Sequence, residues 1–245
     1  MSIKRLDVVG FGPGDMKHMT VEAVDAINDA DIVVGYKTYV DLVKEMFPSK
    51  EYQSTGMGSE KERVILALSL ANDGKRVALV CSGDSSIYGM AALTYELSKE
   101  YPEVNITTIS GVTAAISASA LLGAVAGNDF CTISLSDYHT SWENILRRLR
   151  SSAECDFVIA LYNTRSKKRP DSLKKACDEL LKVLPCERYC GVARSIGRPD
   201  EECFIVSLLE LRDFEAGMFD TVLIGNSKTI LIDGKLVTSR GYEIG

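Results

Sequence analysis

Three segments combine glycine with small polar residues, a combination that suits ligand binding through backbone N–H groups. They are Gly10–Asp15, Ser82–Gly89 and Ser110–Ala114, and the strand candidates Leu6–Gly10, Val77–Cys81 and Ile106–Ile109 lead into them. The carboxyl ends of parallel strands meet at one edge of a sheet, where ligands of open α/β folds bind. Exposed backbone N–H groups there can hold a carboxylate or a polar sugar. The sequence therefore predicts a cleft lined mainly by backbone.

Two side chains in these loops have alternative interpretations. Asp84 either binds an ammonium or hydroxyl group of a ligand or caps the N-terminus of a helix, and Thr113 has the same capping alternative. Thr20 is the expected N-cap of the first helix. Capping and ligand binding stay open for Asp84 and Thr113 at this point.

The first glycine loop does not match a dinucleotide-binding loop. That motif requires G-x-G-x-x-G leading directly into a helix, with an acidic residue about 20 positions later at the end of the second strand. Here Pro13 interrupts the loop, and the helix begins only near Thr20. Asp31 precedes the strand Ile32–Gly35 and so lies at its wrong end. The pattern argues against NAD binding and leaves an ordinary turn with unusual backbone dihedrals as the alternative.

Metal chemistry has little support in the sequence. The chain has seven cysteines and two histidines, His18 and His139. Cys186, Cys190 and Cys203 are the one grouping that resembles a ligand set, and we expect no metal there because the odd cysteine count is typical of free thiols. Arg165–Arg169 holds four positive charges in five residues and is either a solvated loop or a site for carboxylates.

The composition narrows the function classes. The 245 residues carry a formal net charge of −6, which disfavours nucleic acid as a partner. Hydrophobic residues make up 46% of the chain, but no apolar run approaches the about 20 residues that span a bilayer. The N-terminus leads directly into a strand pattern. We expect a cytoplasmic protein without membrane association.

Short β-branched runs alternate with helical patterns, which indicates an α/β fold with mainly parallel sheets. We place a domain junction where a helix ends in glycines, giving domains 1–122 and 123–245, with a parallel N-terminal sheet and a mixed C-terminal sheet. The remaining strand candidates are Cys131–Leu135, Phe157–Leu161, Tyr189–Ala193, Phe204–Ser207 and Thr221–Ile224. The helix candidates are Thr20–Asn28, Glu60–Asp73, Tyr88–Glu100, Thr113–Leu122, Ser141–Ser152 and Ser172–Leu184.

With these motifs the chain resembles the tetrapyrrole (corrin/porphyrin) methylase family over nearly its whole length. The closer likeness is to its C17-methyltransferase branch. The N-terminal motifs are Gly10–Asp15, Met19-Thr20, Ala30–Tyr36 and Ser82–Gly89; the C-terminal ones are Ile133–Asp137, Ala160–Arg169, Arg194–Pro199, Thr221–Ser227 and Val237–Tyr242. The chain departs from the family pattern at Ser85 and Ser110, where the family has proline, and at Tyr138–Trp142.

The resemblance implies a two-domain class III S-adenosylmethionine methyltransferase that forms a homodimer. It implies methyl transfer to C17 of a corrin precursor, precorrin-3B or its cobalt counterpart, with ring contraction in cobalamin biosynthesis. The cofactor contacts carried over are Gly12, Pro13, Ser82, Gly83, Asp84, Ile87, Tyr88, Thr113, Ala114, Leu161, Tyr162, Asn163, Ala193 and Gly197. The substrate contacts expected are Arg165, Lys167 and Lys168. Candidates for proton transfer are Tyr36, Ser136, Asp137 and Arg194.

Three alternatives remain from the sequence. The chain could methylate C11 or C20 as another member of the same family, could be a nucleotide-binding oxidoreductase that uses Gly10–Gly14, or could bind a tetrapyrrole without catalysis. The position of the transferred methyl group, and the cofactor that binds, distinguish them.

Overall fold

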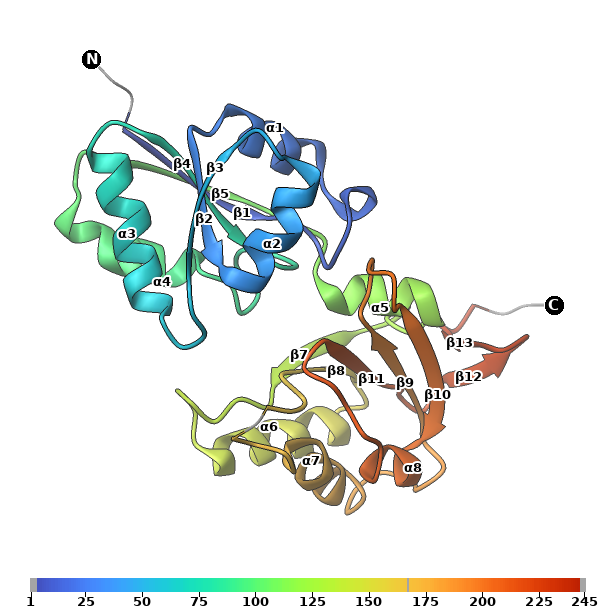
Figure 1. Cartoon of the computed structure of the whole chain (residues 1–245). Helices are drawn as coiled ribbons and strands as arrows, with labels where there is room; N and C mark the ends of the chain where they lie inside the picture. The colour runs from blue at the N-terminus through green and yellow to red at the C-terminus, as the bar shows by residue number, and fades with distance from the viewer. Residues whose placement is uncertain (1–3, 167, 243–245) are drawn as a thin grey trace. The chain divides into compact units, whose positions relative to one another are not determined.

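The N-terminal unit is built on a sheet of five parallel strands. The computed structural model describes residues 4–166 and 168–242, and the chain divides into two compact units, Met1–Ala114 and Ala115–Gly245. The strands of the first unit are β1 Arg5–Gly10, β2 Ile32–Tyr36, β3 Glu51–Thr55, β4 Arg76–Cys81 and β5 Asn105–Ile109. Their order in the sheet is β3-β2-β4-β1-β5 (Figure 1).

Helices cover both faces of this sheet. They are α1 Val21–Asp29, α2 Lys37–Met46, α3 Glu60–Asn72 and α4 Ala91–Leu97, with 3-10 turns η1 Met16–His18 and η2 Ser98–Glu100. One face packs against Ile27 of α1 and Val43 of α2, the other against Leu68 of α3 and Ala91 of α4 (Figure 1). Burial on both sides explains why β4 is apolar along almost its whole length.

The neighbours β1 and β4 are followed by helices on opposite faces, α1 on one and α4 on the other. The connections therefore leave the sheet in opposite directions at this point. Such a switch in direction opens a crevice at the carboxyl ends of the two strands, and ligands of open α/β folds bind in that crevice.

The C-terminal unit contains a mixed five-stranded sheet and a small three-stranded sheet. The strands are β6 Gly123–Ala124, β7 Phe130–Ser134, β8 Val158–Tyr162, β9 Tyr189–Arg194, β10 Glu202–Ser207, β11 Asp220–Ile224, β12 Thr229–Ile232 and β13 Lys235–Thr238. The sheet orders are β10-β9-β11-β8-β7 and β12-β13-β6. Only β7 and β8 pair in parallel in the larger sheet.

One face of the larger sheet is covered by three helices that share its main hydrophobic cluster. These are α6 Trp142–Glu154, α7 Ser172–Leu180 and α8 Leu208–Arg212. Helix α5, Ala114–Leu122, packs against the other face, where a side chain at Gly191 would come within 2.5 Å of Leu122 (Figure 1). The predicted α/β architecture, with a parallel first sheet and a mixed second one, is confirmed.

All nine predicted strands and all six predicted helices are present, with ends shifted by up to four residues. Strand β3 was not predicted because it is a polar edge strand with the sequence EYQST. Helix α2 was not predicted because it follows β2 directly, with Tyr36, a residue that rarely caps helices, at its N-cap. The hairpin of β12 and β13 was also missed, although Asp233-Gly234 at its turn is a hairpin signal.

The predicted junction at 122/123 lies at the C-terminal end of α5, whereas the two units divide at its N-terminal end, between Ala114 and Ala115. Within residues 4–166 and 168–242, no helix has the length and apolar character needed to cross a membrane.

Candidate active site

The glycine loops after β1 and β4 contact each other at the crevice of the N-terminal unit. The N–H of Gly12 donates to the carbonyl of Gly83 at 3.0 Å, and the N–H of Gly83 donates back to Gly12 at 2.7 Å. This reciprocal pair is an antiparallel bridge just beyond the ends of the parallel strands β1 and β4, and Phe11 donates to Cys81 just before it. The two loops Gly10–Asp15 and Ser82–Gly89 are therefore joined by backbone hydrogen bonds.

Two glycines are required for this close approach. Gly12 has a φ of +80°, and a Cβ there would lie 2.5 Å from the carbonyl oxygen of His18. Gly111, after β5, would place a Cβ 2.2 Å from the carbonyl oxygen of Gly83 and 2.5 Å from that of Gly10. Only glycine lets the three strand ends pack so closely.

Asp84 joins these loops through its side chain. The N–H groups of Ser86 and Ile87 donate to Oδ1 at 2.8 and 3.1 Å, and the N–H of Gly111 donates to Oδ2 at 2.9 Å. The residue is 9% exposed. The helix that follows begins only at Ala91, so Asp84 caps a turn and cross-links two loops. Both carboxylate oxygens are thereby used within the protein.

The other capping predictions fall beside the same loops. Thr20 caps α1, as predicted, by accepting the N–H of Ala23 at 3.1 Å, and its hydroxyl donates to the carbonyl of Ser110 at 3.3 Å. Thr113 is buried immediately before α5, and Ala114 is the first residue of that helix. The side chains of Thr20 and Asp84 thus link the loops after β1 and β4 to the backbone of the loop after β5.

The remaining predicted cofactor positions of this unit give the edge an apolar surface. Pro13 is buried and Ser82 is half-buried, while Ile87 and Tyr88 are 36% and 50% exposed. Tyr88 has a φ of +58°, an uncommon conformation for a residue of its size. Exposed apolar side chains such as those of Ile87 and Tyr88 suit the face of a planar ring.

The predicted positions of the C-terminal unit also gather at one edge. Because β7, β8 and β9 run in the same direction, their carboxyl ends lie on the same side of the sheet. Asn163 follows β8 with a φ of +55°, and its Nδ2 donates to Oγ of Ser134 at 2.9 Å. The hydroxyl of Tyr162 accepts the N–H of Ala115 in α5 at 2.9 Å. Leu161 and Ala193 are fully buried, whereas Gly197 has a φ of +69° and donates its N–H to Glu201.

The basic run Arg165–Arg169 contains one cation that is bound by other side chains and others that are exposed. Arg169 is engaged: its Nη1 donates to Ser136 at 2.6 Å and to Asp137 at 3.0 Å. Arg165 is exposed and reaches only the carbonyl of Ala216, at 3.4 Å. Lys168 is exposed, and Lys167 lies outside the described residues. Among the described residues of this run, Arg165 and Lys168 are therefore exposed cations that suit a substrate carboxylate.

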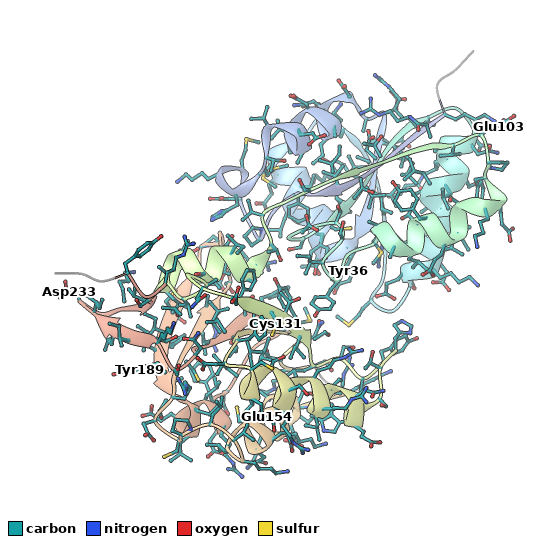
Figure 2. The ribbon with its side chains drawn as sticks, turned by 180° about the vertical axis from the view of Figure 1, so that it is seen from behind. Tyr36, Glu103, Cys131, Glu154, Tyr189 and Asp233 are labelled. Atoms are coloured by element: carbon teal, nitrogen blue, oxygen red, sulfur yellow. The ribbon has the colours of Figure 1, made fainter. Side chains whose placement is uncertain are left out.

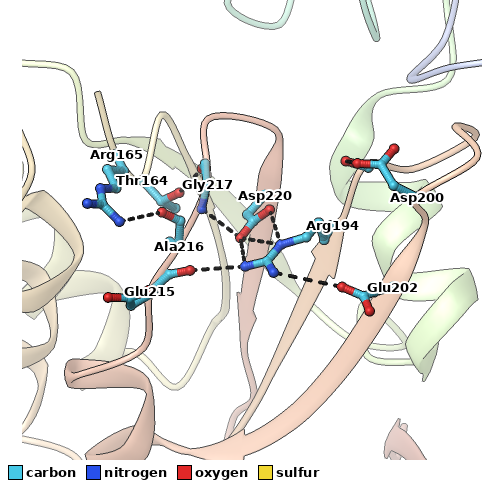
Figure 3. Close-up of polar contacts among 10 residues, drawn as sticks. Thr164, Arg165, Arg194, Asp200, Glu202, Glu215, Ala216, Gly217 and Asp220 are labelled. Carbon is cyan, nitrogen blue, oxygen red and sulfur yellow. Dashed lines mark hydrogen bonds and ion pairs between the residues drawn. The ribbon is translucent and has the colours of Figure 1, made fainter. Parts of the chain in front are cut away.

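Arg194, a candidate for proton transfer, is held in a network (Figure 3). Its Nε and Nη2 donate to the Asp220 carboxylate at 3.1 and 3.0 Å, and Nη2 also donates to the carbonyl of Glu215 at 3.0 Å. The guanidinium lies over the rings of Phe204 and Phe214. The hydrogen bond with Asp220 raises the pKa of Arg194 further. A permanently protonated side chain whose Nε and Nη2 are hydrogen-bonded is suited to holding structure rather than to moving a proton.

The same network extends to the loop after β8. The N–H of Gly217 donates to Asp220 at 2.8 Å, and the hydroxyl of Thr164 donates to the carbonyl of Gly217 at 3.4 Å (Figure 3). Thr164 is 1% exposed. The Arg194–Asp220 pair thus fixes the backbone that presents Asn163 and Arg165.

Tyr36, another proton-transfer candidate, lies at the carboxyl end of β2. Figure 2 shows it at one end of the N-terminal unit and Glu103 at the other. Its ring packs edge-on against Tyr39, with centroids 5.2 Å apart, and the guanidinium of Arg63 lies 5.8 Å from its centroid. The sequence analysis missed Arg63, which is 4% exposed. Its signal was present, because it shares a helical face with Ala67 and Ala71 at spacings of four and eight.

Two predicted motifs lie away from these edges. Gly225–Ser227 follows β11 at the opposite end of the larger sheet, where Ser227 donates to Asp156 ahead of β8. Asp31 precedes β2 and pairs with Arg76 at 2.7 Å, so its predicted position at the wrong end of the strand for NAD is confirmed. Among the described residues, no group of three His, Cys, Asp or Glu side chains could hold a metal ion.

Comparison with known proteins identifies close relatives over the full length. The chain is 45% identical to a protein from Salmonella typhimurium named "Probable cobalt-factor III C(17)-methyltransferase", over 98% of this chain and 100% of the relative. It is 39% identical to a protein from Sinorhizobium named "Precorrin-3B C(17)-methyltransferase", over 93% of this chain and 91% of the relative.

Solved structures agree with these sequence relationships. A crystal structure described as the methyltransferase CobJ matches with a TM-score of 0.90 and 33% identity, over 96% of this chain and 99% of that one. The uroporphyrin-III C-methyltransferase of Thermus thermophilus, complexed with S-adenosylhomocysteine, has the same fold at a TM-score of 0.73 and 18% identity, over 90% of this chain and 97% of that one. The model of the tetrapyrrole (corrin/porphyrin) methylases matches residues 5–212. With its paired glycine loops and its two-unit fold, the chain belongs to the tetrapyrrole (corrin/porphyrin) methylase family.

Proposed function

We propose that this protein transfers a methyl group from S-adenosylmethionine to C17 of a corrin precursor in cobalamin biosynthesis. The acceptor is cobalt-factor III (cobalt-precorrin-3) or precorrin-3B, and methylation accompanies contraction of the ring. The observation that carries the proposal is full-length similarity, at 45% and 39% identity, to proteins named as methyltransferases for that carbon of these two acceptors.

The N-terminal crevice fits the proposed cofactor. S-adenosylmethionine supplies a methyl group that its sulfonium already activates, so the protein needs mainly to position it. The backbone at Gly12, Gly83 and Gly111 carries no side chain that would block approach, and exposed Ile87 and Tyr88 offer an apolar surface for adenine. In this arrangement Asp84 holds the loops in place, because its carboxylate already accepts three backbone N–H groups.

The C-terminal edge supplies groups for the acceptor. Arg165 and Lys168 are exposed cations that suit the carboxylates of a corrin precursor. Ring contraction requires proton movement, and Tyr36, Ser136 and Asp137 are the candidates whose side chains suit it better than Arg194. Substituting Asp137 by Asn and Tyr36 by Phe, with kcat measured for each variant, tests the two assignments separately.

The decisive experiment is a product analysis. Purified protein is incubated with S-adenosylmethionine and either acceptor, and the product is examined by mass spectrometry and by NMR of the methyl position. We expect one added methyl group at C17. A methyl group at C11 or C20 would instead make the protein another member of the family, and an unchanged tetrapyrrole would favour a binding protein.

We further propose a cytoplasmic homodimer. Ile230, Leu231 and Ile232 on the edge strand β12 are 49%, 45% and 46% exposed, and an apolar edge strand is a surface that a second copy can cover. Light scattering after size exclusion should give twice the mass of one chain for the protein and a lower mass for Leu231→Glu. Leu209→Glu, at an exposed position on α8, is the matched control. A monomeric parent protein would contradict the proposal.

A further inference from the structure

Arg63 on α3 places a positive charge inside the N-terminal unit. The residue is 4% exposed. Its Nε donates to Oγ1 of Thr55 at 2.9 Å, and its Nη2 donates to the carbonyl of Gly56 at 2.9 Å. Its Nη1 has only the thioether sulfur of Met90, at 3.8 Å. All three acceptors are neutral, and a thioether is a weak one.

The other buried charged side chains among the described residues pair with an opposite charge or accept backbone N–H groups. Asp7 pairs with Arg5 at 2.8 Å, Glu179 with Lys182 at 2.7 Å, and Asp220 with Arg194 at 3.0 Å. Asp84, as described above, accepts three backbone N–H groups. Among the described residues Arg63 is the one buried Lys or Arg, and its hydrogen-bond partners include no carboxylate. Its charge therefore lacks a counterion.

An uncompensated buried cation is costly, and the usual solutions are a paired anion or neutralisation. Arginine cannot lose its proton in a protein, so only an anion resolves the imbalance. Nη1 is the guanidinium nitrogen that lacks an oxygen acceptor. Met90 beside it is half-buried, and its flexible side chain can move aside at low cost.

Most partners of Arg63 lie on the β2–β3 side of the sheet. Tyr36, Thr55 and Gly56 lie at the carboxyl ends of β2 and β3, whereas Met90 directly follows the Ser82–Gly89 loop after β4. The glycine loops follow β4, β1 and β5, on the other side of the strand order β3-β2-β4-β1-β5. An anion that reaches Arg63 is thus next to the proposed cofactor crevice, not within it.

We propose that Arg63 binds a carboxylate of the tetrapyrrole acceptor, which displaces the Met90 sulfur from Nη1. The inference rests on the proposed function for the identity of the acceptor. The methionyl part of the cofactor carries the same chemical group, and the sheet order assigns the site to the acceptor instead. Arg63 is then a binding residue that orients the acceptor against the cofactor crevice.

The test measures binding of two ligands separately. Calorimetry is performed with S-adenosylhomocysteine and with cobalt-factor III or precorrin-3B, whichever binds the parent protein more tightly. For Arg63→Gln we expect the affinity for the tetrapyrrole to fall by about thirtyfold or more, since a buried charge pair loses one partner. S-adenosylhomocysteine should bind within about twofold of the parent value, because most partners of Arg63 lie on the β2–β3 side of the sheet, away from the glycine loops. Arg63→Lys keeps the charge and should recover part of the loss.

A matched control uses another arginine without a described ion pair. Arg147 is exposed on α6, and Arg147→Gln removes the same charge and should leave both affinities within about twofold. If Arg63→Gln binds the tetrapyrrole as tightly as the parent protein does, the inference is wrong. Loss of S-adenosylhomocysteine binding alone would assign the site to the cofactor carboxylate and overturn it too.

A second pair of variants avoids removing the arginine. Met90→Glu places a carboxylate beside Nη1, and Met90→Gln is its neutral counterpart. We expect Met90→Glu to bind the tetrapyrrole at least about tenfold more weakly than Met90→Gln, because an internal anion replaces that of the acceptor. Equal binding by the two variants would contradict the inference.

The two proposals can fail separately. A parent protein that binds the tetrapyrrole but methylates a carbon other than C17 contradicts the proposed function and leaves the role of Arg63 intact. A parent protein that binds neither tetrapyrrole contradicts both. Normal C17 methylation with unchanged binding by Arg63→Gln contradicts only the role of Arg63.

Discussion

At the scale of single residues, Asp84 shows how a predicted binding side chain is used inside the protein. Its two oxygens accept N–H groups from its own turn and from the loop after β5. The sequence suggested either a ligand contact or a helix cap. The structure gives a third role, a cross-link between loops, because Gly111 lies 27 positions away in the sequence yet adjacent in the sheet.

Replacing Asp84 by Asn should destabilise the protein by about 1–3 kcal/mol, because the amide NH2 faces a backbone N–H and leaves one buried donor unsatisfied. Affinity for S-adenosylhomocysteine should fall as well, since the loops separate. Chemical unfolding and calorimetry measure the two effects. Asp25→Asn, at an exposed position on α1, is the control. Unchanged stability with weakened binding would indicate that Asp84 contacts the ligand directly.

Asp31 gives a prediction for acid stability. Hydrogen bonds from the side chain and then the backbone of Arg76 lower the pKa of Asp31 from 3.8 to about 2. As the pH falls, Asp31 is protonated in the unfolded chain before it is protonated in the folded protein. The stabilisation by the Asp31–Arg76 pair is therefore present above pH 4 and is lost as the pH falls toward 2. Both side chains are more than a third exposed, and solvent screening keeps the effect small.

Urea unfolding of the protein and of Asp31→Asn between pH 2 and pH 7 checks this assignment. The parent protein should be slightly more stable at neutral pH, and the two curves should converge near pH 2. If the free energies of unfolding of the two proteins still differ at pH 2, the ion pair of Asp31 with Arg76 is not the source of the difference. Asp25→Asn should follow the parent curve throughout.

At the scale of elements, three strand ends form one edge because their glycines allow backbone to contact backbone. Gly111→Ala would place its Cβ 2.2 Å from the carbonyl oxygen of Gly83, a contact that only separation of the loops can relieve. We expect a loss of stability of about 1–3 kcal/mol, comparable with overpacking of a core, and loss of cofactor binding. Gly56→Ala, where a Cβ meets nothing within 4 Å, should leave both properties unchanged.

Thermal unfolding and calorimetry with S-adenosylhomocysteine compare the two variants. Normal cofactor affinity in Gly111→Ala would show that the junction of the β4 and β5 loops does not form the cofactor site. Because Gly56→Ala adds the same methyl group without a close contact, any loss seen only in Gly111→Ala comes from packing.

At the scale of the whole molecule, the seven cysteines differ in environment. Cys81, Cys177 and Cys190 are buried, whereas Cys155, Cys186 and Cys203 are exposed. Burial raises the pKa of Cys81 to about 11 and that of Cys177 to about 12, and raises that of Cys190 as well. These thiols stay protonated at neutral pH and are poor nucleophiles.

Brief alkylation of the native protein at pH 7.5 should therefore modify the three exposed cysteines, with Cys203 the slowest because its pKa is also raised. Peptide mass spectrometry identifies the modified positions, and the urea-unfolded protein, in which all seven react, is the control. Rapid modification of Cys81 would show that the core of the N-terminal unit is open in solution.

Much of the fold was predictable from local patterns. The period of apolar residues located nine strands, and the distribution of glycine located both the β1 and β4 loops. Strand β3 and helix α2 were not predictable in this way, since β3 is a polar edge strand and α2 follows β2 directly, with the poor capping residue Tyr36 at its N-cap. Their formation depends on contacts with β2, which a linear pattern does not reveal.

The sequence by itself determined the alternation of strands and helices, the glycine loops and the family. It also determined that Asp31 precedes β2, where it cannot bind the ribose of NAD. These are properties of neighbouring residues or of motifs. Only the tertiary structure decided which side chains are already engaged, because partners such as Asp84 and Gly111 or Arg194 and Asp220 are distant in sequence. The same applies to Arg63: the missing counterion of a charge becomes visible only when everything packed around it is known.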